Sequence, residues 1–265
     1  MERISRALEL AVQQRESRER AEPAHAAAED SARTATFRAP IVALDPQVLE
    51  REHVLPPNAG GGHGHAYKLL RTQVLRRLDQ LQANTLAVLS PTAEAGKTLT
   101  AINLAIAIAA EHGRTALLVD MDLRNPRVHQ RLGFEPTLGI EDCLQSDRPV
   151  HDAILRVAGY ERLAVLPARA AVEHSSELLT SQRASQLVAE LRARYTNRII
   201  LFDLPPVLQA DDALAFSKTV QAGLMVVGEG RTQRKELLQG MELLRDLTIV
   251  GTVLNGSREP ARAAY

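Results

Sequence analysis

A Gly-Lys-Thr sequence lies where an apolar run ends and a helical pattern begins. Residues 85–89 are apolar, the loop after them closes with Gly96, Lys97 and Thr98, and residues 97–111 have a helical pattern. Such a loop directs backbone N–H groups, a lysine and the positive end of a helix at a polyphosphate. Lys97 would reach the β- and γ-phosphate oxygens, and the Thr98 hydroxyl would coordinate magnesium. The spacing predicts a nucleoside triphosphate site.

The loop departs from the usual phosphate-loop pattern at two positions. Pro91 stands where G-x-x-x-x-G-K-[ST] has its first glycine, and Glu94 occupies a position that is glycine in many such loops. Because a carboxylate beside a triphosphate opposes binding unless it turns outward, Glu94 predicts a modest affinity. Nucleotide contacts are expected from Ala93, Glu94, Ala95, Gly96, Lys97, Thr98 and Leu99.

Three aspartates follow apolar runs, at positions where strands would end. Asp120 and Asp122 come at the end of the run 115–119, and Asp203 closes the run 198–202. Ligands of parallel α/β sheets bind at the carboxyl ends of the strands, so we expect these acids beside the loop. Carboxylates there can hold magnesium. Side chains alternate along a strand, so the chain must leave the sheet near Asp120 for both neighbouring acids to serve one metal.

Apolar runs alternate with helical patterns after residue 65. This alternation predicts an α/β fold with a mostly parallel central sheet and helices on both faces. The expected strands lie at 85–89, 115–119, 162–166, 198–202, 223–228 and 249–254, and the expected helices at 97–111, 177–194, 211–218 and 233–246.

The composition of the chain changes near residue 65, which suggests three parts. Residues 1–64 are expected to form a short helix and a flexible linker that ends in the glycine-rich stretch 60–65. Residues 65–257 are expected to form the α/β domain, and residues 258–265 a flexible tail with a terminal tyrosine, Tyr265. The N-terminal helix is predicted from an apolar stripe made of Ile4, Leu8, Ala11 and Val12.

Charge and cysteine content exclude several function classes. Lys+Arg and Asp+Glu number 32 each, so no net field draws the molecule to nucleic acid. One cysteine, Cys143, excludes an intramolecular disulfide and a zinc or iron–sulfur cluster built on cysteines. No apolar run approaches the ~20 residues of a membrane span. We expect a soluble protein of the cytosol that reaches a membrane through a partner.

The motifs around these residues resemble those of a known family. Gly96-Lys97-Thr98, Val119-Asp120-Met121-Asp122-Leu123-Arg124 and Phe202-Asp203-Leu204-Pro205-Pro206 resemble the P-loop tyrosine autokinases of bacterial capsule and exopolysaccharide systems. These kinases belong to the deviant Walker group of P-loop ATPases, which includes partitioning and division-site proteins. The resemblance covers about residues 66–256 and implies the P-loop NTPase fold.

The resemblance also implies roles for single residues. Lys97 and Thr98 would bind ATP and Mg²⁺, and Asp120 would approach the incoming tyrosine hydroxyl. Asp122 and Asp203 would order magnesium together with Thr98. Asn255 would lie near the adenine, and Tyr265 would be the phosphoacceptor, reached in trans by a self-associating chain. The implied partner is a membrane polysaccharide chain-length or co-polymerase protein, whose cytoplasmic tail would recruit the kinase to the inner face of the plasma membrane.

Two alternatives to an autokinase remain open. Family members usually end in a tyrosine cluster and carry Glu-x-x-Arg-x-x-Arg in a helix that assembles a ring, whereas this chain ends with one tyrosine and has His65 to Arg71 there. These departures favour an ATP-dependent switch that regulates a membrane polysaccharide complex without kinase activity. A DNA-partitioning ATPase is disfavoured, because the net charge is zero and Thr92 stands where that group has a signature lysine.

Overall fold

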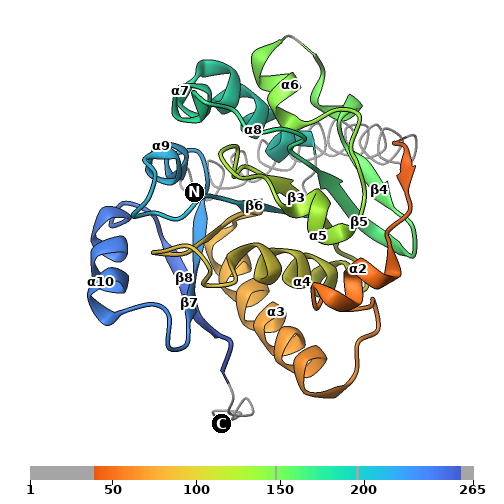
Figure 1. Cartoon of the computed structure of the whole chain (residues 1–265), viewed down its shortest axis with the longest axis horizontal. Coiled ribbons are helices and arrows are strands. Elements are labelled where there is room, and N and C mark those ends of the chain that lie inside the picture. Colours follow the sequence, from red (N-terminus) through yellow and green to blue (C-terminus); the bar gives the residue numbers. More distant parts are fainter. Residues whose placement is uncertain (1–38, 147, 195–196, 258–265) are drawn as a thin grey trace, which may run out of the picture.

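The computed structural model describes residues 39–146, 148–194 and 197–257 (Figure 1). The predicted helix over residues 1–12, the linker over 13–36 and the tail over 258–265 lie outside the described residues. One eight-stranded sheet runs through the described part of the chain.

The strands lie in the order β1-β4-β5-β3-β6-β2-β7-β8. All neighbouring pairs are parallel except β4 and β5, which pair antiparallel. The prediction of a mostly parallel sheet is confirmed. The strands are β1 (Ile41–Val42), β2 (Thr85–Leu89), β3 (Thr115–Asp120), β4 (Leu155–Val157), β5 (Tyr160–Leu166), β6 (Arg198–Asp203), β7 (Ala222–Gly228) and β8 (Ile249–Asn255).

Helices cover both faces of this sheet, as Figure 1 shows. α3 and α4 pack on one face, whereas α6, α8 and α9 pack on the other. The helices are α2 (Pro46–Arg51), α3 (Gly61–Leu81), α4 (Lys97–Ala109), α5 (Val128–Leu132), α6 (Ile140–Gln145), the short 3-10 helix η1 (Val150–Asp152), α7 (Ser175–Thr180), α8 (Gln182–Arg194), α9 (Asp212–Ser217) and α10 (Arg234–Leu243).

Each face of the sheet carries its own apolar core. Leu117 and Val119 of β3 pack in one core with Leu187 of α8, whereas Leu118 packs in the other with Ile102 of α4. Strands covered on both faces are apolar at every position, because both sets of alternating side chains are buried. For this reason the continuous apolar runs in the sequence locate β2, β3, β5, β6 and β7, whereas β8, which lies at the edge of the sheet, is only partly buried.

The prediction that residues 1–64 form a short helix and a flexible linker is wrong for residues 39–64, which are ordered against the domain. β1 pairs with β4, and α2 begins after Asp45, whose Oδ1 accepts a hydrogen bond from Gln47 N at 2.9 Å. Leu55 N donates to Asn103 Oδ1 at 2.8 Å, and Tyr160 O–H donates to Leu55 O at 3.2 Å. These side chains from the domain satisfy the backbone groups of an otherwise irregular segment.

Two further expectations need correction. The glycine-rich stretch 60–65 does not end a flexible linker but contains the first turn of α3. The helical pattern over 177–194 is two helices, because Ser181 has an extended backbone and separates α7 from α8. The Ser181 hydroxyl donates to Leu178 O at 2.6 Å and accepts from Ala184 N at 3.1 Å, which satisfies groups at both helix ends.

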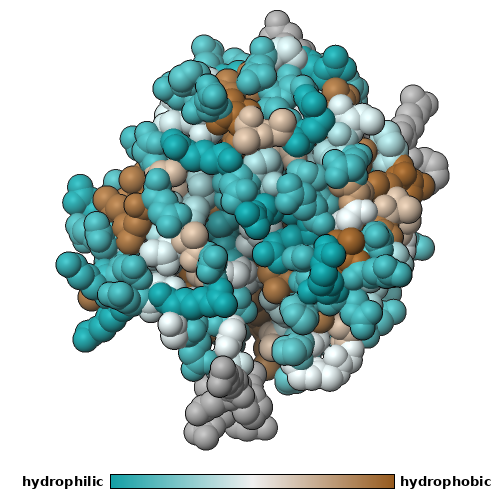
Figure 2. Space-filling model, in the orientation of Figure 1, coloured by the Kyte–Doolittle hydropathy of each residue, from teal (hydrophilic) through white to brown (hydrophobic). Residues whose placement is uncertain are grey.

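The surface of the described residues is mostly hydrophilic. Figure 2 shows an apolar patch over α10, a helix on which Leu238 and Leu243 are exposed. Within the described residues no helix has the length and apolar content needed to cross a bilayer.

Candidate nucleotide-binding site

The phosphate loop connects the end of β2 with the start of α4. Gly96 precedes the helix with a φ of 85°, in the left-handed region that glycine adopts most easily. A Cβ at this position would overlap the side-chain amide of Asn255, whose Nδ2 donates to Ala95 O at 3.0 Å. Gly96 is therefore required both by its backbone conformation and by the close approach of β8.

Substitution of Gly96 tests this requirement. Gly96→Ala is expected to weaken nucleotide binding at least about tenfold, because an alanine in this conformation costs about 1–2 kcal/mol and also displaces Asn255. Gly113→Ala is the matched control, since Gly113 has a φ of 83° and nothing within 4 Å of its added Cβ. Titration with a fluorescent nucleotide measures both variants. Equal losses of affinity in the two would contradict the steric contact with Asn255.

Glu94 turns away from the loop interior. Its side chain is 82% exposed, and Arg231 Nη1 lies 3.7 Å from Glu94 Oε2 and donates to Glu94 O at 3.1 Å. The carboxylate that would oppose a triphosphate thus faces solvent and a cation. Ala93 beside it is also exposed, whereas Leu99 packs partly against the apolar core under α4.

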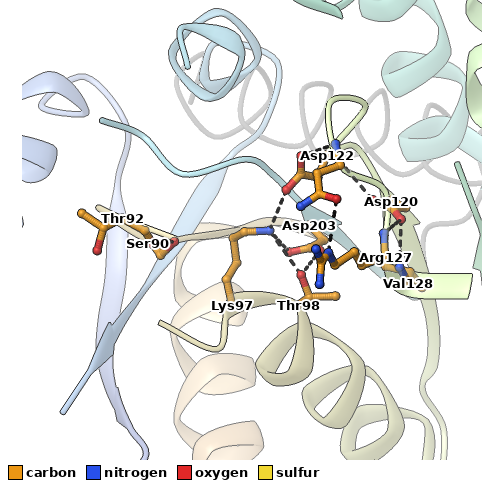
Figure 3. Close-up of polar contacts among 10 residues, drawn as sticks. Ser90, Thr92, Lys97, Thr98, Asp120, Asp122, Arg127, Val128 and Asp203 are labelled. Carbon is orange, nitrogen blue, oxygen red and sulfur yellow. Dashed lines mark hydrogen bonds and ion pairs between the residues drawn. The ribbon is translucent and has the colours of Figure 1, made fainter. Parts of the chain in front are cut away.

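Lys97 is the centre of a compact polar cluster. Its Nζ lies 2.6 Å from Asp203 Oδ1, 3.5 Å from Asp122 Oδ2 and 3.4 Å from Thr98 Oγ1. The Thr98 hydroxyl donates to Asp203 Oδ2 at 2.7 Å. Figure 3 shows these four side chains pointing toward one another from α4, β6 and the segment after β3. The structure brings four of the predicted site residues together.

The cluster is buried, and this perturbs its titration. Burial lowers the pKa of Lys97, but Asp203 and Asp122 outweigh that effect, so its net pKa is raised and the ammonium stays charged. Burial also raises the pKa of Asp122, and the nearby Lys97 charge offsets part of that rise. Several pKa values shifted together by burial and by neighbouring charges are typical of a functional site.

Asp120 lies beside the cluster but faces another way. Asp120 and Asp203 are opposite each other in the β3–β6 register. Asp120 Oδ1 accepts from Asp122 N at 3.2 Å, and its Oδ2 accepts from Arg127 N at 3.1 Å and Val128 N at 3.0 Å (Figure 3). Burial, followed by the charge of Asp203, raises the pKa of the Asp120 carboxyl well above its usual range. In this structure Asp120 holds the start of α5.

The donor set of the cluster fits a magnesium ion bound with a nucleotide. Thr98, Asp122 and Asp203 supply the hard oxygen ligands that Mg²⁺ prefers. The described residues contain no group of three His, Cys, Asp or Glu side chains arranged to hold a metal alone. Such a site suits Mg²⁺, which commonly takes one or two carboxylates and completes its shell with waters and phosphate oxygens.

Two arginines near the site were given no role from the sequence. Arg124 Nε lies 3.1 Å from both carboxylate oxygens of Asp212, which is fully buried and also accepts from Ser175 Oγ at 2.5 Å. This bond network ties the segment after β3 to α7 and α9. Arg127 extends from the start of α5 and was not predicted either. The signal available in the sequence was the proximity of both arginines to Asp122.

A phosphate loop before α4, with acids at the ends of the adjacent strands β3 and β6, defines the class of P-loop nucleotide-binding proteins. The sequence profile of the CobQ/CobB/MinD/ParA nucleotide-binding domain matches residues 86–263. The chain belongs to this family.

Two kinases and one septum site-determining protein are among the similar proteins. Tyrosine-protein kinase YwqD of Bacillus subtilis (strain 168) is 27% identical over 201 residues, which are 75% of this chain and 83% of YwqD. The kinase domain of Escherichia coli ETK superposes with a TM-score of 0.67 at 27% identity, over 76% of this chain and 78% of that domain. The septum site-determining protein MinD of Pyrococcus horikoshii, complexed with Mg-ADP, gives a TM-score of 0.56 at 25% identity, over 68% and 74%.

The chain is homologous to these bacterial tyrosine-protein kinases. It matches most of YwqD but spans only 27% of the length of tyrosine-protein kinase etk of Escherichia coli (strain K12). The expected resemblance to bacterial tyrosine kinases within the partitioning-ATPase group is confirmed.

Proposed function

We propose that the protein is an ATP-dependent protein-tyrosine autokinase that phosphorylates Tyr265 in trans and regulates polymerisation and export of an exopolysaccharide or capsule. The observation that carries this proposal is the cluster in which Asp203, Asp122 and Thr98 surround Lys97. Its homologues that bear the name tyrosine-protein kinase support the choice of a tyrosine as acceptor.

The loop amides and Lys97 bind the β- and γ-phosphates of ATP in this proposal, while Asn255 lies near the adenine. Thr98, Asp122 and Asp203 would hold Mg²⁺, which supplies neutralisation of phosphate charge. The tyrosine oxygen bonds to the γ-phosphorus, and the bond from that phosphorus to the β–γ bridging oxygen breaks, so that ADP leaves with the electron pair. Asp120 takes the phenolic proton after releasing some of its three N–H donors.

The tyrosines of the described residues do not compete with Tyr265 as acceptors. Tyr160 is buried and donates its hydroxyl to Leu55 O. Burial raises the pKa of Tyr67, although hydrogen bonds with Asn103 and Thr100 oppose that rise. Hydroxyls held in this way cannot enter an active site without local unfolding.

Peptide mapping tests the acceptor. After incubation of the purified protein with Mg-ATP, one phosphate is expected on Tyr265, and Tyr265→Phe is expected to remove it. Intact mass and tandem mass spectrometry measure both. Tyr160→Phe is the matched control, since that hydroxyl is packed inside the domain. Unchanged phosphotyrosine in Tyr265→Phe would show that the acceptor lies elsewhere.

A nucleotide switch without kinase activity is the second candidate. The start of α3 favours it, because residues 65–71 lack the Glu-x-x-Arg-x-x-Arg pattern. ATP hydrolysis and ATP-dependent self-association without phosphotyrosine would support the switch over the kinase.

The proposed partner is a membrane polysaccharide chain-length or co-polymerase protein. Its cytoplasmic tail would recruit this protein to the inner face of the plasma membrane. ATP, Mg²⁺ and a second copy of the chain complete the set of proposed partners.

A further inference from the structure

Arg127 extends a hydrogen-bonded chain that starts at Lys97. Lys97 Nζ lies 3.5 Å from Asp122 Oδ2, and Asp122 Oδ1 accepts from Asn125 N at 3.2 Å. Asn125 Oδ1 in turn accepts from Arg127 Nε at 3.2 Å. In Figure 3 the Arg127 side chain runs from the start of α5 toward Thr98 and Asp203. Three consecutive contacts therefore connect its guanidinium with the centre of the site.

The backbone N–H and the Nε of Arg127 are hydrogen-bonded, whereas its two terminal guanidinium nitrogens remain available to a ligand. The backbone N–H donates to Asp120 Oδ2 at 3.1 Å, and Nε donates to Asn125. In the described part of the chain no carboxylate forms an ion pair with Arg127, and the residue is exposed. The two terminal nitrogens can thus donate four N–H groups to a ligand.

The other cations around the site are already paired. Lys97 contacts Asp203 at 2.6 Å, and Arg124 contacts Asp212 at 2.9 Å. Arg231 lies beside Glu94. Phosphoryl transfer spreads negative charge over the γ-phosphoryl oxygens, and in a site with several carboxylates a cation besides Lys97 and the proposed Mg²⁺ would stabilise that charge.

We propose that Arg127 is a catalytic arginine supplied by the same chain, which donates hydrogen bonds to the γ-phosphoryl oxygens during transfer. Its planar fork matches two oxygens of one phosphoryl group, which a lysine cannot do. Arg127 gains and loses no proton in the step. Asp120 and Asn125 are positioning residues for it, since they fix its backbone and its Nε. The inference rests on the proposed phosphoryl transfer and names a residue for it.

Binding of a transition-state mimic tests this role without relying on catalysis. Mg-ADP with aluminium fluoride imitates the transferring phosphoryl group, and calorimetry compares its affinity with that of Mg-ADP alone. Arg127→Ala is expected to bind Mg-ADP within about twofold of wild type but to lose at least about 100-fold of the tightening that fluoride produces, as arginine fingers contribute 10³ or more to transfer. Arg127→Lys is expected to recover only part of that tightening.

Arg131→Ala is the matched control on the same helix, because Arg131 pairs with Glu52 at 2.9 Å, away from the phosphate loop. It is expected to keep the full tightening. The inference is overturned if Arg127→Ala keeps it, if both variants lose it equally, or if wild type binds Mg-ADP but gains nothing from fluoride. Phosphotyrosine in wild type would leave the proposed function intact in each of these cases. A wild type without phosphotyrosine or Mg-ADP binding would defeat the proposed function itself.

Discussion

Lys97→Met is expected to abolish phosphotyrosine formation, with a loss of at least about 10³-fold in transfer rate, as for removal of a principal phosphate-binding charge. Lys97 is the buried cation that contacts both Asp203 and Asp122. Without it, these carboxylates would face a triphosphate of the same sign. Methionine keeps the length and apolar stem of lysine, so the change isolates the charge. Quantitative mass spectrometry after incubation with Mg-ATP measures the loss.

Nucleotide binding is expected to be lost together with transfer. Saturating Mg-ATP at 100 times its Kd stabilises a folded protein by about 2.7 kcal/mol, which thermal unfolding detects. This shift is expected in wild type and is expected to be absent in Lys97→Met. Lys235→Met on α10 is the matched control, because Lys235 is exposed and does not pair with Asp122 or Asp203. A normal thermal shift in Lys97→Met would contradict the assignment of this lysine to the phosphates.

The unliganded Lys97→Met protein is also expected to be less stable. Removing one partner of a buried ion pair commonly costs about 3–5 kcal/mol, because the remaining charge has no compensation. Urea unfolding at neutral pH measures this cost. The difference from wild type is expected to shrink at acidic pH, where the remaining carboxylates take up protons and no longer repel one another.

Asp120→Ala is expected to destabilise the fold as well as abolish activity. The three N–H groups of Asp122, Arg127 and Val128 would lose their acceptor at a fully buried position. Each unsatisfied buried donor costs about 1–3 kcal/mol, so a loss of about 4 kcal/mol is expected. Urea unfolding monitored by circular dichroism measures it. A loss of activity in this variant therefore does not by itself identify Asp120 as the group that accepts a proton.

Asp120→Asn separates the two roles of this side chain. The amide keeps one oxygen for Arg127 and Val128, while its NH₂ faces the N–H of Asp122, so about 1–2 kcal/mol of stability is expected to be lost. If Asp120 accepts the phenolic proton, phosphotyrosine formation falls in this variant although Mg-ATP binding remains. Nearly normal transfer would restrict Asp120 to the support of α5 and of Arg127.

The sequence predicted the sheet better than the segments around it. β2 and β6 are buried at every position, so their residues form continuous apolar runs that can be found without tertiary information. β1 has two residues and α2 has six, which is too short for a periodic pattern to distinguish them from a linker. Their order depends on distant groups such as Asn103 and Tyr160, which bond to Leu55.

The amino-acid sequence by itself determined the phosphate-loop residues and the carboxylates of the site. Lys97 and Thr98 had to begin a helix after a buried strand, and Asp120 and Asp203 had to end strands, because local apolar patterning fixes where the strands stop. Only the tertiary structure decided which oxygen meets which donor. Strand register placed Asp120 opposite Asp203. The bend after β3 then turned the Asp120 carboxylate toward α5 and aimed Asp122 at Lys97. The directions of these two side chains depend on the backbone geometry that results from strand pairing. Residue type and spacing along the chain do not reveal that geometry.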